Sequence, residues 1–95
     1  MREPKLHTFN NTKEATVIIN GSNWSSLKSI ACSQKNNMLT KFSVIHIHQQ
    51  ITYIVLRVDD IVWQDILYTI DGINTEPGDI IKVVADNPID IIITI

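Results

Sequence analysis

The sequence predicts a single small α+β domain in which two helices lie on one face of a mostly antiparallel sheet. The chain has 95 residues, enough for one hydrophobic core but not for two. Eighteen of the residues are isoleucine, a β-branched type that favours strands. Two segments also carry apolar residues at helical spacing. Taken in chain order, these signals give the element order β-α-β-β-α-β-β.

The N-terminal part of the chain divides into an arm and a first strand. Residues 1–13 lack apolar periodicity and include Pro4, so we expect a flexible arm. The remaining residues, 14–95, then form the α+β domain. Its first predicted strand, Ala15–Asn20, is rich in β-branched residues and ends at Asn20-Gly21, a strong turn signal.

Two helices are predicted from apolar residues spaced three or four positions apart. Ser22 or Asn23 can cap the first helix, and Asn36-Asn37 can end it. Asp59-Asp60 can cap the second helix, and Gly72 can end it. The apolar stripes are Trp24, Leu27, Ile30 and Ala31, followed by Val62, Trp63, Ile66, Leu67 and Ile70. Each stripe contains one tryptophan, which we expect to be buried in the core.

Four more strands are predicted around two turns. The strands are Phe42–His48, Ile51–Val58, Ile80–Ala85 and Ile89–Ile95. The first two meet at Gln49-Gln50, which has no glycine, so one long bent strand is the alternative. Glu76-Pro77-Gly78-Asp79 predicts a type II turn before the third strand. A second turn is expected at Asp86-Asn87-Pro88.

The two faces of the predicted sheet give the main functional expectation. If Ile45 and Ile47 face the helices, the histidines beside them face the opposite way. The late strands carry aliphatic side chains on both faces, more than two helices can cover. Either the sheet folds over on itself, or a protein partner or second copy covers this face or pairs with the C-terminal strand as an open edge. The expected interaction residues are His46, His48, Tyr53, Arg57, Ile91 and Ile93.

Charge and composition narrow the classes of partner. Residues 1–50 carry a net charge of +4 and residues 51–95 a net charge of −6, which together give the overall −2. The acidic balance and the lack of a basic stripe argue against direct nucleic-acid binding. An acidic inhibitor that competes for a nucleic-acid-binding partner is an alternative. No apolar run reaches the roughly 18 residues of a membrane span, and the polar N-terminus lacks a signal peptide, so we expect a cytoplasmic protein.

The sequence offers few candidate catalytic or metal-binding residues. His46 and His48 are two residues apart on a predicted strand, so both imidazoles can face one metal ion. A metal site needs further ligands, and the pattern does not position His7 or Cys32 as one. The neighbours of Cys32 supply no activating base. We therefore expect a non-enzymatic, regulatory protein-binding module without a cofactor, and keep a metal-dependent or enzymatic domain built on the two histidines as the alternative.

Overall fold

The computed structural model describes residues 5–20, 25–33, 39–61 and 65–95, and within these ranges the chain forms strands and no helix. The strands are β1 (Leu6–Ile18), β2 (Ser25–Ser33), β3 (Thr40–His48), β4 (Ile51–Ile61), β5 (Asp65–Thr75) and β6 (Ile80–Thr94). All of their pairings are antiparallel, and together they make a curled half-barrel sheet. The predicted α+β class is therefore wrong, and the described chain is an all-β domain.

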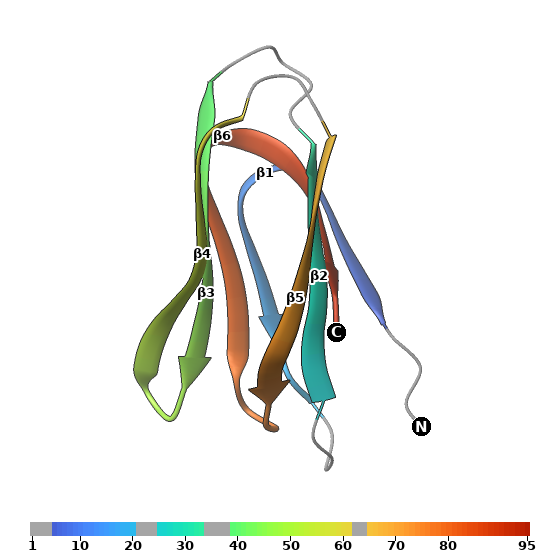
Figure 1. Cartoon of the computed structure of the whole chain (residues 1–95), viewed down its shortest axis with the longest axis vertical. Coiled ribbons are helices and arrows are strands. Elements are labelled where there is room, and N and C mark those ends of the chain that lie inside the picture. The colour runs from blue at the N-terminus through green and yellow to red at the C-terminus, as the bar shows by residue number, and fades with distance from the viewer. Residues whose placement is uncertain (1–4, 21–24, 34–38, 62–64) are drawn as a thin grey trace.

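β1 and β6 form a long bent ribbon that runs through both sides of the fold. β6 pairs with β1 from end to end. On its other side, the first part of β6 pairs with β3 and the last part pairs with β2. β4 then pairs with β3, and β5 pairs with β2. Figure 1 shows β6 arching between these two sides, which we call the β3–β4 half and the β2–β5 half.

The bend in the ribbon replaces a predicted turn. We expected Asp86-Asn87-Pro88 to separate two strands, but the segment lies inside β6. The register of β1 against β6 shifts here, which marks bulges. Asp90 Oδ1 accepts the Asn11 N–H at 2.8 Å, and Asp86 Oδ1 accepts the Lys41 N–H at 2.8 Å. These carboxylates satisfy backbone donors at the bend.

The core lies between the two halves. Its buried side chains are Ala15, Val17, Ile19, Leu27, Ile30, Cys32, Phe42, Val44, Ile81, Val83, Ala85, Ile89, Ile91 and Ile93. Each fully buried branched aliphatic contributes about 1.5–3 kcal/mol. Ile91 and Ile93, which we expected on an exposed face or edge, have no exposed surface. Their strand is paired on both sides, so β6 is not an open edge.

The first predicted helix is β2, and a bulge explains the misleading pattern. Leu27 and Ile30 are both buried although they are three positions apart. In a regular strand, residues three apart point to opposite faces. The register of β2 against β5 shifts between Leu27 and Ser29, with the extra residues on β5, so the strand pairing is irregular between these two buried positions. The spacing therefore imitates a helix.

The second predicted helix is also absent from the described residues. Its span falls on the end of β4 and on β5, which pairs with β2. Ile66, Tyr68, Thr69 and Ile70 belong to types that favour strands, and this preference outweighs the apolar spacing. The two tryptophans expected in the core lie outside the described residues.

Several local predictions are confirmed. β3 and β4 form a hairpin in which Gln49 and Gln50 have φ values of 49° and 67°. In the Glu76–Asp79 turn, Gly78 has a φ of 94°, as a type II turn requires. The flexible arm expected over residues 1–13 differs from the structure, because the residues from Leu6 onward belong to β1. The described part of the chain contains no helix that could cross a membrane.

Candidate functional site

His46, His48 and Asp79 form a polar cluster at one end of the β3–β4 half. The two histidines lie on the same face of β3, as the sequence predicts. The face is the opposite of the expected one, because His46 points into the molecule and is only 9% exposed. His46 pairs with Ile81 and Ile47 pairs with Ile80. This antiparallel register brings the start of β6, and with it Asp79, to the histidines.

Both imidazoles contact the same carboxylate. His46 Nε2 lies 2.8 Å from Asp79 Oδ2, and His48 Nδ1 lies 2.8 Å from Asp79 Oδ1. Each ring nitrogen donates to its oxygen when it carries a proton. Glu76 Oε2 lies 3.8 Å from His48 Nδ1 on the more exposed side of the cluster. Both carboxylate oxygens of Asp79 therefore have hydrogen-bond partners, although the residue is almost completely buried.

The turn between β5 and β6 fixes the position of Asp79. The Glu76 N–H donates to Asp79 Oδ2 at 3.0 Å, and the Asp79 N–H donates to the Glu76 carbonyl at 3.0 Å. The end of β1 also holds this turn, because Ile19 N–H donates to the Asp79 carbonyl at 2.8 Å and Gly78 N–H donates to the Ile19 carbonyl at 2.8 Å. Backbone contacts from two directions thus hold the carboxylate in place.

Contacts within the cluster change the pKa values of Asp79 and His48. Burial alone would raise the pKa of Asp79, but hydrogen bonds from the Glu76 backbone, His46 and His48 outweigh it, and the pKa of Asp79 is lowered. The hydrogen bond to Asp79 raises the pKa of His48; partial desolvation opposes this shift, while the negative charges of Asp79 and Glu76 add to it. The two shifts together favour a carboxylate facing an imidazolium.

A second feature is an apolar area on the outer surface of the same half. Five isoleucines lie there: Ile18 is opposite Ile80 and Ile80 is opposite Ile47, while Ile45 lies between Ile54 on β4 and Lys82 on β6. Directly paired residues share a face of the sheet. None of the five packs against the core, and Ile18 and Ile54 are 56% and 59% exposed. We call Ile18, Ile45, Ile47, Ile54 and Ile80 the isoleucine face.

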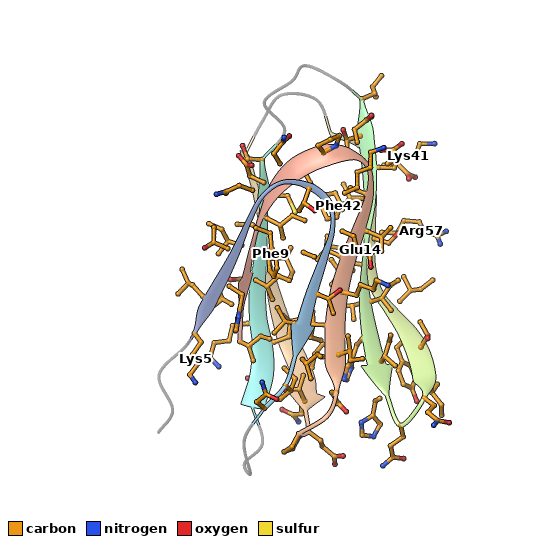
Figure 2. The ribbon with its side chains drawn as sticks, turned by 180° about the vertical axis from the view of Figure 1, so that it is seen from behind. Lys5, Phe9, Glu14, Lys41, Phe42 and Arg57 are labelled. Carbon is orange, nitrogen blue, oxygen red and sulfur yellow. The ribbon has the colours of Figure 1, made fainter. Side chains whose placement is uncertain are left out.

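Charged residues border the isoleucine face. Arg57 pairs with Ser43, and Figure 2 shows Arg57 and Lys41 projecting outward. They line a shallow depression together with Asp59 and Asp86. Tyr53 pairs with His46 near the hairpin tip, is 48% exposed, and has its ring centroid 6.3 Å from that of His46. The predicted interaction residues therefore lie in three places. His46 and His48 lie in the histidine cluster with Tyr53 beside them, Arg57 lies on the outer surface, and Ile91 and Ile93 lie in the core.

Comparison of this chain with protein-family models, curated proteins and solved structures finds no match. The chain's own geometry therefore carries the functional argument.

The cluster offers two nitrogen donors and one carboxylate, a set suited to a divalent metal ion or to a charged hydrogen-bond network. Sequence reasoning missed Asp79, because its place beside β3 depends on the pairing of β3 with β6. The two other candidate ligands lie elsewhere, with His7 opposite Ile93 and Cys32 opposite Ile91. Burial also raises the pKa of the Cys32 thiol to about 12, so it is not a ready nucleophile.

Proposed function

We propose that this protein is a non-enzymatic binding module that self-associates through the isoleucine face. The observation that carries the proposal is the register of five isoleucines across β1, β6, β3 and β4, on the side of the sheet away from the core. Contiguous exposed apolar patches on small proteins usually mark interaction sites. A second copy buries such a patch without any further partner.

The surroundings of the isoleucine face favour a second copy. In a twofold interface the same surface meets itself, so it must be self-complementary. Aliphatic side chains satisfy this condition because they can pack on one another. The border satisfies it as well, since Lys41 and Arg57 lie beside Asp59 and Asp86, and each sign can meet its opposite on the other copy. The Lys82–Glu14 ion pair on the outer surface, at 2.8 Å, also presents both signs.

Sedimentation of matched variants tests the proposal. Ile54→Lys places a charge on the isoleucine face, and we expect it to convert a wild-type dimer to a monomer because a buried unpaired charge is costly. Leu6→Lys is the matched control, because Leu6 is 66% exposed but lies in the β2–β5 half, opposite Thr94. We expect the control to sediment like the wild type.

Two results would overturn self-association. The first is a wild-type protein that stays monomeric up to a concentration on the order of 100 μM, which corresponds to an association weaker than about 5–6 kcal/mol. The second is an equal loss of the dimer in both lysine variants, which would show that added charge, and not the site of the change, decides the outcome.

A further inference from the structure

We propose that His46, His48 and Asp79 form a binding site for one divalent transition-metal ion, with Zn²⁺ as the expected occupant. The site lies at the end of the β3–β4 half and does not depend on self-association. One donor atom from each of the three residues lies within 4.8 Å of the other two. Two imidazole nitrogens and a carboxylate oxygen are a common donor set for Zn²⁺.

The backbone pre-orients these donors. His46 and His48 alternate on β3 and so share one face, while the β5–β6 turn and the end of β1 hold Asp79. A metal ion would thus bind to groups that already converge, and little chain ordering would be required. Metal binding would link β3 to the β5–β6 turn, two segments that are more than thirty positions apart in the chain.

The distances require a small adjustment. Zn²⁺ ligands lie about 2.0–2.2 Å from the ion, which places tetrahedral donor atoms about 3.3–3.5 Å apart. Two nitrogen–oxygen distances, each to a different oxygen of Asp79, are 2.8 Å and must open by about half an ångström. The other donor pairs lie within 4.8 Å and must adjust to the same tetrahedral spacing. The His48 side chain is 28% exposed and lies at the open side of the cluster, where it has room to move.

The charges suit a dication. Asp79 supplies a buried carboxylate, and His46 and His48 would bind the ion in their neutral form. Glu76 adds a second carboxylate at the exposed side, 3.8 Å from His48 Nδ1. Glu76 or a water molecule can therefore complete four-coordination, while the buried side of the site is closed by the core. Histidine nitrogens favour Zn²⁺, Ni²⁺ and Cu²⁺ over Ca²⁺ and Mg²⁺.

Titration of the full chain with ZnCl₂ tests the site. We expect one Zn²⁺ per chain by calorimetry, a rise in melting temperature with Zn²⁺ concentration, and visible absorption bands when Co²⁺ replaces Zn²⁺. His48→Gln changes a partly exposed side chain and should fold. We expect it to weaken Zn²⁺ binding by more than about 100-fold, because loss of a direct ligand costs at least as much as loss of an outer-shell partner.

Two further variants complete the experiment. Asp79→Asn removes the anionic ligand while keeping its size, and we expect the same loss. His7→Gln is the control for adventitious histidine binding, because His7 lies on β1 opposite Ile93, and it should bind like the wild type. If Asp79→Asn does not fold, His48→Gln decides the question. The proposal is overturned if Zn²⁺ leaves the wild type unchanged, if His48→Gln binds as tightly as the wild type, or if His7→Gln loses binding equally.

Discussion

The outer surfaces of the two halves differ in chemistry, although β1 and β6 run through both. The β3–β4 half presents the isoleucine face. In the β2–β5 half, the outward positions are mixed: Thr8, Ser29, Ala31, Ser33 and Thr94 are small or polar, whereas Ile92 and the 66% exposed Leu6 are aliphatic. Antiparallel sheets with one face in water usually place polar residues there. The β2–β5 half follows this rule more closely than the β3–β4 half does.

The two halves therefore differ in degree: the outer surface of the β3–β4 half carries five isoleucines, and that of the β2–β5 half carries more serine and threonine. In the β2–β5 half the ribbon carries Leu6, Thr8, Ile92 and Thr94 on its outer side, and β2 adds Ser29, Ala31 and Ser33. Burial against a second copy, as proposed above, would account for the larger number of outward isoleucines in the β3–β4 half. The histidine cluster also belongs to the β3–β4 half, on its inner face, so both candidate sites lie in the same half of the molecule.

The largest expected effect is on the free energy of unfolding, and it distinguishes a core residue of β3 from a residue of the isoleucine face on the same strand. Phe42 is buried in the core, whereas Ile45 belongs to the isoleucine face and lies outside the core. We expect Phe42→Ala to lower the free energy of unfolding by about 3–5 kcal/mol. Ile45→Ala should lower it by less than about 1 kcal/mol, because a partly exposed side chain loses little on truncation.

Urea unfolding measures both values, and an Ile54→Lys background keeps the protein monomeric for the comparison. Equal losses in the two variants would contradict the distinction, since the isoleucine face would then contribute to folding as much as the core does.

The sequence predicted features that depend on neighbouring residues. The β3–β4 hairpin and the Glu76–Asp79 turn follow from runs of strand-forming residues and from proline and glycine positions. The first helix was wrong because Leu27 and Ile30, three positions apart, are both buried in β2, whose pairing with β5 is irregular between them. The second was wrong because the strand preference of residues in β5 outweighs the apolar spacing. The turn expected at 86–88 was wrong because β1 and β3 supply backbone donors to Asp90 and Asp86, which let β6 continue through its bend.

The features that the sequence did not predict depend on pairing between strands far apart in the chain. Hydrophobicity alone placed Ile45 and Ile47 inward and His46 outward, and the structure has the reverse arrangement. His46 can be buried because Asp79, 33 positions away, accepts its hydrogen bond. That partner is invisible until the register of β3 against β6 is known. The sequence did leave open a sheet that folds over on itself, and the bent ribbon does so for the inner face.

The pH dependence of stability tests the cluster that only the β3–β4 half contains. The pKa of His48 is raised above 6.5 in the folded state, so its contribution is complete below pH 6.5 and is lost as the pH rises through the raised value. The pKa of Asp79 is lowered below 3.8, so its contribution is complete above pH 3.8 and is lost as the pH falls through the lowered value. The pair therefore contributes most between about pH 4 and 6.5.

Thermal melts of the wild type and His48→Gln, recorded with a chelator from pH 4 to 9, test this profile. Glutamine can still donate a hydrogen bond to Asp79, so the variant removes the charge and keeps a donor. We expect the difference in melting temperature to be largest from pH 4 to 6.5 and to shrink as the pH approaches 9. A constant difference across the range would contradict the ion pair.

The smallest expected effect concerns the turn that joins the two strands at the edge of the β3–β4 half. Gln50 has a φ of 67°, a left-handed conformation that costs an L-residue about 1–2 kcal/mol. Glycine removes this cost but gains about 0.5–1 kcal/mol of entropy in the unfolded chain. Gln50→Gly should therefore raise the free energy of unfolding by about 0.5 kcal/mol, and chemical denaturation can measure the change.

Thr52→Gly is the control, because Thr52 is an exposed residue in β4 where glycine relieves no strain, and it should lower the free energy of unfolding. A loss in Gln50→Gly equal to that in Thr52→Gly would contradict the left-handed turn. Since Gln50→Gly leaves every isoleucine and histidine of the β3–β4 half unchanged, it should alter stability without altering self-association or Zn²⁺ binding. Stability of the fold and the two binding sites would then be separable properties of the same half of the molecule.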